Sequence, residues 1–106
     1  MEINKIKTYI NFSKRSRNIV YGVEDIVKSK KIEIVFISND LAESSKNKLD
    51  KFINDKNIFK IYIDKNDMFE LLQVNAVKAF GITDANLAKA IKMNFTNNVS
   101  NGGNLE

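Results

Sequence analysis

The chain has 106 residues, of which 17 are Lys or Arg and 13 are Asp or Glu, so its formal net charge is +4. This length predicts one domain built around a single hydrophobic core. The sequence contains no His and no Cys, which excludes zinc fingers, thiolate nucleophiles and Ser-His-Asp triads, so we expect no enzyme activity, no metal and no cofactor.

The hydrophobic pattern of the first half predicts helices that alternate with short strands. Ile3, Ile6 and Ile10 recur at helical spacing, and residues 32–37 form a nearly continuous apolar run, as a buried strand would. Asp40 follows that run and supplies the chemistry of a helix N-cap. The predicted elements are a helix over residues 2–13, a short apolar segment at 19–21, a helix at 23–30, a strand at 32–37 and a helix ending near 55.

The second half continues this alternation. Asp64 to Asp67 offers a helix cap, and Thr83 has the chemistry of an N-cap for a last helix whose apolar face reaches Phe95. The predicted elements are a strand at 59–63, a helix through about residue 73, a strand at 77–82 and the last helix. Residues 96–106 are polar, which predicts a flexible tail after a domain at 1–95, and Leu105-Glu106 matches a cloning remnant.

Alternation of strands and helices along a chain indicates parallel strand pairing through right-handed crossovers. We therefore expect an α/β fold, a three-layer α-β-α sandwich with a four-stranded, largely parallel (mixed) sheet. In such sheets ligands bind beyond the strand ends, where helix N-termini point.

The positive charge is concentrated near the N-terminus. Residues 1–31 contain eight Lys or Arg and three Asp or Glu, whereas residues 32–106 contain nine Lys and ten acidic residues. The many Lys, Ile and Asn residues are typical of an A+T-rich genome, but such drift would spread the charge evenly. Clustering of this kind favours a surface that faces phosphates.

One stretch combines these cations with a glycine at the start of a predicted helix. Lys14, Arg15 and Arg17 precede a short apolar segment, and Gly22 then precedes the helix. Free backbone N–H groups at such a helix start bind phosphate, and glycine permits a close approach of the backbone. The simpler interpretation is a solvated helix end with a glycine turn and an ion pair between Glu24 and Lys28.

Three segments, taken in order, resemble a known family. They are the basic run 13–18 followed by Ile19-Val20, Gly22, Glu24-Asp25 and Lys28; Ser38-Asn39-Asp40 followed by the Ser- and Lys-rich segment 44–48; and Ile82-Thr83-Asp84 followed by Ala88-Lys89. Their order and spacing resemble the kink-turn-binding ribosomal protein superfamily, and more specifically its bacterial YlxQ-like branch. The resemblance covers residues 5–93.

The resemblance implies an α-β-α sandwich and the binding of structured RNA, ribosomal or kink-turn-like. Members of the family use the glycine, the following polar pair and the lysine at this helix start to engage tandem sheared G·A pairs. Carried over, the expected RNA-binding residues are Gly22, Glu24, Asp25 and Lys28, with Lys14, Arg15 and Arg17 as phosphate neighbours.

The chain departs from the family pattern in two places. Glu24 stands where well-characterised members have Asn, and a carboxylate only accepts hydrogen bonds whereas an amide also donates. The second RNA-facing loop of the family has two glycines, which Phe69 and Gln73 replace here. Bulky side chains prevent the close backbone approach of glycine, so we expect apolar contact or plain helix in residues 68–75.

The second departure leaves an alternative function open, a protein-interaction module that kept the fold and lost RNA recognition, with its partner near Phe69. Leu71 and Leu72 fit the core better. Other side chains also have two interpretations. Asp40, and Asp64 with Asp67, are catalytic or metal-binding candidates or simple caps, and Lys46, Lys48 and Lys51 extend the basic surface or form a solvated helix face.

No apolar run approaches the roughly 20 residues of a membrane span. The N-terminal segment has a polar residue at every second or third position, so it lacks the apolar core of a signal peptide. We therefore expect a cytoplasmic protein with no membrane partner.

Overall fold

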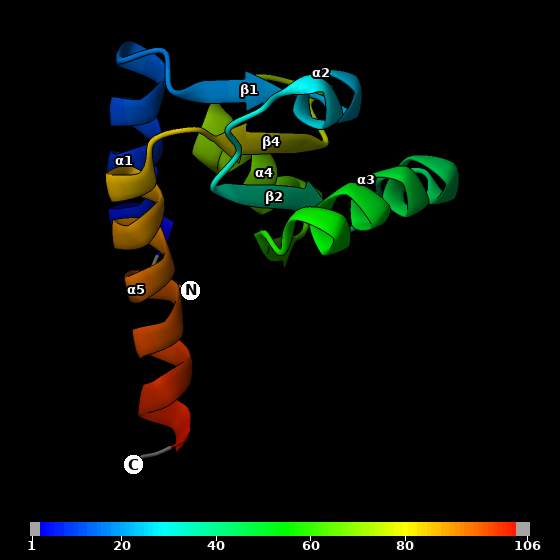
Figure 1. Ribbon diagram of the computed structural model, residues 1–106. Coiled ribbons are helices and arrows are strands. Elements are labelled where there is room, and N and C mark those ends of the chain that lie inside the picture. The colour runs from blue at the N-terminus through cyan, green and yellow to red at the C-terminus, as the bar shows by residue number, and fades with distance from the viewer. Residues whose placement is uncertain (1–2, 104–106) are drawn as a thin grey trace.

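The computed structural model describes the backbone of residues 3–103 and the side chains of residues 3–95. Helices and strands alternate along it, as the hydrophobic pattern predicts (Figure 1). The elements are α1 (Ile3–Arg15), β1 (Ile19–Tyr21), α2 (Val23–Lys28), β2 (Ile34–Ser38), α3 (Glu43–Lys56), β3 (Phe59–Ile63), α4 (Lys65–Leu72), β4 (Ala79–Ile82) and α5 (Ala85–Gly103).

The four strands form one mixed sheet in the order β1-β4-β2-β3. β2 and β3 pair in parallel, whereas β4 is antiparallel to both of its neighbours, β1 and β2. The predicted mixed α/β class is confirmed, but the expectation that parallel pairing predominates is wrong. The first three strands share one direction, and β4 inserts between β1 and β2 in the opposite sense.

The direction of β4 follows from the connection that precedes it. Ser38 at the end of β2 donates its N–H to the carbonyl of Lys78 at 2.8 Å, so β4 starts at the sheet end where β2 stops. In the parallel register Ser38 lies opposite Ile63, so β3 stops at this end as well. The chain leaves β3 at this sheet end, and helix α4, with eight residues, and the segment 73–78 bring it back to the same end.

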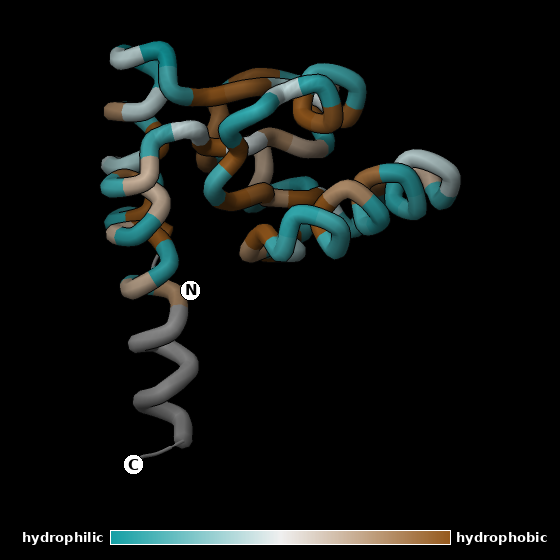
Figure 2. Tube along the Cα trace, in the orientation of Figure 1, coloured by the Kyte–Doolittle hydropathy of each residue, from teal (hydrophilic) through white to brown (hydrophobic). Residues whose placement is uncertain are grey.

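Helices cover both faces of the sheet and produce three layers. Ile34 and Phe36 of β2 contact the layer of α1, α4 and α5, whereas Val35 and Ile37 contact the layer of α2 and α3. All five residues of β2 are buried, which explains why its sequence is almost continuously apolar. Figure 2 shows the same division, with mostly hydrophobic strands and a largely hydrophilic α3.

Of the predicted helix caps, the one at Asp64 is confirmed and the one at Asp40 is wrong. Asp64 caps α4, because its Oδ1 accepts a hydrogen bond from the N–H of Asp67 at 2.8 Å. Asp40 does not cap α3. The residue in the cap position is Ala42, which provides no side-chain hydrogen bond. The chain makes a turn between Asp40 and the helix, and the hydroxyl of Ser38 donates to the Asp40 carboxylate instead.

The cap of α5 lies one residue later than predicted. Asp84 Oδ1 accepts a hydrogen bond from the N–H of Leu87 at 2.9 Å, so Asp84 caps the helix. Thr83 donates its hydroxyl to Asn18 Oδ1 at 3.3 Å and thereby joins the end of β4 to the start of β1. A carboxylate is at least as good a cap as a threonine hydroxyl, which is why the local sequence did not separate the two.

Helix α5 runs beyond the predicted end of the domain. Its bounds, Ala85–Gly103, include residues 96–103, which the sequence assigns to the flexible tail. Leu105 and Glu106 lie outside the described residues, so the tail remains a prediction. None of the helices in the described part of the chain is long and apolar enough to cross a membrane.

The stacked rings of Phe36 and Phe80 mark the centre of the core. They are register partners on β2 and β4, their centroids are 4.7 Å apart, and both side chains are fully buried. We predict that Phe36→Ala lowers the free energy of unfolding by about 3–5 kcal/mol, because the truncation leaves a cavity in a packed layer. Urea unfolding followed by circular dichroism measures this loss.

Phe12→Ala is the matched control, since Phe12 is 53% exposed and its ring contacts Arg15 through a cation–π interaction. Its expected cost is below about 1 kcal/mol. Equal losses for the two variants would contradict this description of the core.

Candidate nucleic-acid interface

Gly22 connects β1 to α2 in a conformation that few other residues adopt. Its φ is 87° and its ψ is 150°, and a Cβ placed on it would meet no atom within 4 Å. Glycine is therefore required by the backbone angle and not by crowding. The Gly22 N–H bonds to the Ala79 carbonyl at 2.8 Å, while no described side chain caps the first turn of α2. The first-turn N–H groups after Gly22 are thus open to an outside acceptor.

The first turn of α2 carries two exposed carboxylates, Glu24 and Asp25. Lys48 of α3 pairs with Glu24 at 2.6 Å and donates a hydrogen bond to it. This hydrogen bond and the charge of Lys48, with a smaller contribution from Lys28, lower the pKa of Glu24 below its ordinary value. The Glu24 carboxylate therefore stays ionised to a lower pH than an ordinary glutamate does.

A second ion pair lies beside this turn, at the neighbouring strand ends. Lys78, just before β4, pairs with Asp40, just after β2, at 3.2 Å. The hydroxyl of Ser38 and, less strongly, Lys78 lower the pKa of Asp40. Lys78 also lines a hollow of about 380 Å³ together with Gly22, Glu24 and Asp25.

We call this surface the glycine face. It comprises Tyr21, Gly22, Glu24, Asp25, Lys28, Asp40, Lys48 and Lys78. Tyr21, which is 39% exposed, lines the same hollow. The face therefore combines open backbone donors, carboxylate acceptors, lysine side chains and one aromatic ring.

A deeper depression adjoins the glycine face. It has a volume of about 490 Å³, runs between α4 and the segment 74–78, and shares Ala76 and Lys78 with the first hollow. Phe69 and Val74 line it and are each 45% exposed. We call it the α4 groove.

The C-terminal half of α4 and its cap contain Phe69 and Gln73, which stand where the resembled family has two glycines. Residues up to Leu72 are plain helix, as expected. Gln73 then adopts the left-handed conformation, with φ 63°, that usually selects glycine at a helix end. This costs on the order of 1 kcal/mol for a residue with a Cβ. The chain thus keeps the turn while adding side chains to it.

The structure brings only part of the expected site together. Gly22, Glu24, Asp25 and Lys28 share α2 and its cap, as predicted. The expected neighbours Lys14, Arg15 and Arg17 lie beyond the other end of β1, away from Gly22. Their contact with RNA phosphates stays a prediction.

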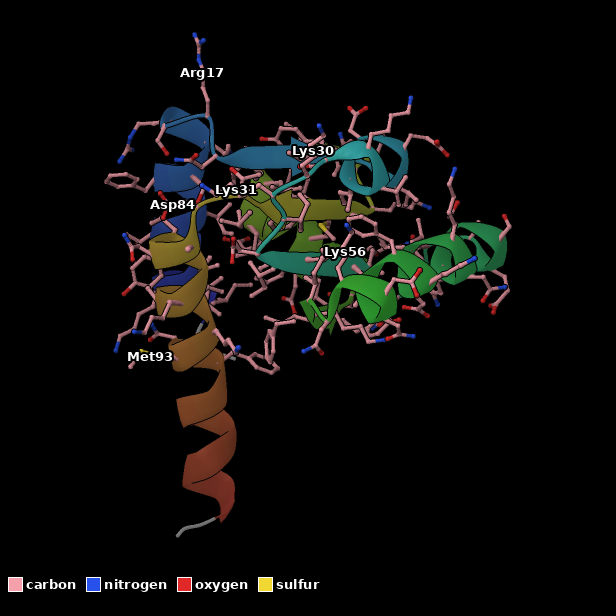
Figure 3. All side chains as sticks on the ribbon, viewed as in Figure 1. Arg17, Lys30, Lys31, Lys56, Asp84 and Met93 are labelled. Carbon is pink, nitrogen blue, oxygen red and sulfur yellow. The ribbon has the colours of Figure 1, made fainter. Side chains whose placement is uncertain are left out.

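Two contacts fix this separation. Gly22 bonds to Ala79 at one end of β4, while Asn18, next to Arg17, bonds to Thr83 at the other end. The extended segment from Asn18 to Gly22 spans roughly 13 Å. Lys14 donates instead to the carbonyl of Leu72 at 2.8 Å, and Figure 3 shows Arg17 projecting outward from the α1–β1 connection.

Sequence reasoning did not place three contributors on this surface: Asp40, Lys48 and Lys78. Lys48 belonged to a lysine cluster with two interpretations, and its partner Glu24 lies 24 residues earlier, so no local pattern reveals the pair. Lys78 and Asp40 meet because two strand ends coincide. The rule that sites form at strand ends is the signal that points to them. Within the described residues no group of three or more acidic side chains is placed to hold a metal ion.

No protein-family model matches the sequence, and no curated protein matches it either. Solved structures do match. A protein of unknown function from Bacillus halodurans aligns with a TM-score of 0.75 and 18% identity, over 84% of this chain and 94% of that one. The Giardia lamblia 15.5 kD RNA-binding protein aligns with a TM-score of 0.68 and 19% identity, over 89% of this chain and 88% of that one. Both share the fold of this chain.

The ion pair of the glycine face gives a test of its geometry. We predict that Lys48→Met raises the pKa of Glu24 towards its ordinary value, because it removes the hydrogen bond and the charge that lower it. Wild-type Glu24 contributes stability above its ordinary pKa, and that contribution is lost as the pH falls through the lowered value. An NMR titration of the side-chain carboxyl carbons reports the change directly.

The matched control is Lys51→Met on the same helix, since Lys51 forms no ion pair with a described residue. It should leave the Glu24 titration unchanged. A Glu24 pKa that is equally insensitive to Lys48→Met would show that the two side chains do not meet in solution.

Proposed function

We propose that the protein binds structured RNA through the glycine face and does not catalyse a reaction on it. The fold supports this proposal, because a protein described as RNA-binding shares it over 89% of this chain. The observation that carries the proposal is the composition of the glycine face. Backbone donors and carboxylate acceptors there lie within one turn of a helix, with lysines beside them.

Each group of the face suits a different part of RNA. Glu24 and Asp25 would accept hydrogen bonds from amino and imino N–H groups on base edges, which are donors that a carboxylate matches. Lys28, Lys48 and Lys78 would contact phosphates, which fix position and register rather than sequence. Tyr21 offers a ring on which an unpaired base can stack.

The finer proposal concerns the RNA itself. Bases with exposed N–H edges occur where non-canonical pairs open the helix, so we propose a kink-turn-like element as the target, in ribosomal RNA of the cytoplasm. The site residues implied by the family resemblance, Gly22, Glu24, Asp25 and Lys28, coincide with the part of the face that α2 holds together. Carboxylates in place of an amide favour RNA edges that only donate.

A second candidate function rests on the α4 groove. The exposed side chains of Phe69 and Val74 in a depression of about 490 Å³ resemble the apolar centre of a protein interface. In this alternative the fold is kept, RNA recognition is lost, and Phe69 contacts a protein partner. Light scattering or pull-down of a Phe69→Ser variant against wild type separates this function from RNA binding.

A salt-titrated binding assay tests the RNA proposal. The probes are a kink-turn RNA, a kink-turn with its G·A pairs mutated, and a plain RNA duplex. We predict the tightest binding to the kink-turn, and the double variant Glu24→Ala/Asp25→Ala should lose this preference because it lacks the base-edge acceptors. Lys48→Ala/Lys78→Ala should weaken binding to all three RNAs. It should also reduce the salt slope, the steepness with which the logarithm of the binding constant falls with the logarithm of salt concentration, by about two, one for each phosphate contact.

Lys5→Ala/Lys89→Ala is the matched control for charge, since both lysines are exposed on helices away from the glycine face. It should change the affinity less than the Lys48/Lys78 pair does. Failure of the wild-type protein to bind any of the three RNAs at low salt would refute the proposed function.

A further inference from the structure

Of the eight Lys and Arg residues among the first 31, Lys28 belongs to the glycine face, and three others lie at the opposite sheet end: Arg17, Lys30 and Lys31. Around the last residues of β4, the Thr83 N–H bonds to the Asn18 carbonyl at 2.9 Å and the Glu33 N–H bonds to the Ile82 carbonyl at 2.8 Å. Arg17 directly precedes Asn18, and Lys31 lies two residues before Glu33. Both cations therefore flank the same strand end.

A third segment joins them from β3. Ile34 of β2 lies opposite Phe59 in the register, so the start of β3 reaches this end too, and Lys56 lies three residues before Phe59. Lys30, Lys31 and Lys56 line one hollow of about 200 Å³. The remaining residues that line it are Ser29, Ile32, Glu33, Phe52 and Ile58. Three lysines thus surround a small polar depression that contains one carboxylate.

Arg17, Lys30, Lys31 and Lys56, which we call the far-end face, are all exposed (Figure 3). None of the four forms an ion pair with a described residue, whereas Lys48 and Lys78 of the glycine face each pair with a carboxylate. Lys56 lies in the last turn of α3, where it offsets the helix dipole. That role does not account for the other three, which lie in connections.

We infer that the far-end face binds the phosphate backbone of a second RNA segment while the glycine face holds the first. This inference rests on the proposed function. The four cations extend across the ends of all four strands, about 15 Å at the usual strand spacing, and this width spans several phosphates of a nucleic-acid backbone. Lysine side chains with no aromatic or amide side chain beside them bind phosphates by charge and do not distinguish base sequences. Of the nearby acids, Glu33 is exposed and Asp84 is occupied as the cap of α5.

The test measures binding to a plain RNA duplex in rising salt. The triple variant Lys30→Ala/Lys31→Ala/Lys56→Ala should bind more weakly than wild type, with a salt slope smaller by about three. The control Lys5→Ala/Lys51→Ala/Lys89→Ala removes the same charge from exposed positions outside both faces and should change the slope less. Circular dichroism verifies that both variants are folded. With the glycine face filled by one equivalent of unlabelled kink-turn RNA, which leaves the far-end face open, the duplex should still bind to wild type and lose its binding to the triple variant.

Each outcome decides the inference. Equal slopes for the two triple variants, or complete displacement of the duplex by the kink-turn RNA, would overturn the far-end site and leave the proposed function standing. Loss of binding to polyglutamate by the triple variant, with RNA binding intact, would identify a site for an acidic protein and refute the inference. A wild-type protein that binds neither RNA would remove the proposed function and this site together.

Discussion

The hydrogen bonds of β4 to both β1 and β2 determine which polar residues lie together at each end of the sheet. Because β4 runs against its neighbours, its start coincides with the ends of the other strands and its end coincides with their starts. Gly22, Asp40 and Lys78 therefore lie at one end, and Asn18, Glu33 and Thr83 lie at the other. The stacked pair Phe36 and Phe80 fixes this register from within the core.

The two ends differ in electrostatic character. On the glycine face, lysines and carboxylates pair across elements, which leaves an approximately balanced surface suited to hydrogen bonding. On the far-end face, four cations lie without described ion-pair partners, and their field is sequence-independent and sensitive to salt. Within the described residues, the sheet thus carries one surface of approximately balanced charge and one of uncompensated positive charge.

Local sequence patterns were sufficient for the elements, because burial and helical spacing leave their marks within a few residues. The strand at 59–63 has the predicted bounds, and Asp64 caps α4 as its chemistry indicates. The direction of β4 was not predictable, since it depends on where residues 73–78 deliver the chain. Strand alternation alone favoured parallel pairing, which only β2 and β3 adopt.

The candidate site was predicted in part for the same reason. Residues of one helix turn stay together, so Gly22, Glu24 and Asp25 were found from spacing and family resemblance. Arg17 is five residues from Gly22 in sequence but is separated from it by an extended strand. Lys48 is 24 residues from Glu24 and forms an ion pair with it. Proximity in the sequence wrongly suggested that Arg17 lies beside Gly22, and it gave no sign that Lys48 contacts Glu24.

The proposed RNA site is the open first turn of α2. Backbone amide shifts in a two-dimensional NMR titration with a kink-turn RNA test it most directly, because the amides of residues 23–25 have no described side-chain cap. We predict the largest shifts at Gly22 to Asp25 and in the neighbouring segment 74–78, at protein concentrations where a plain duplex leaves them unchanged. Shifts confined to other parts of the sheet, with the first turn of α2 unaffected, would contradict it.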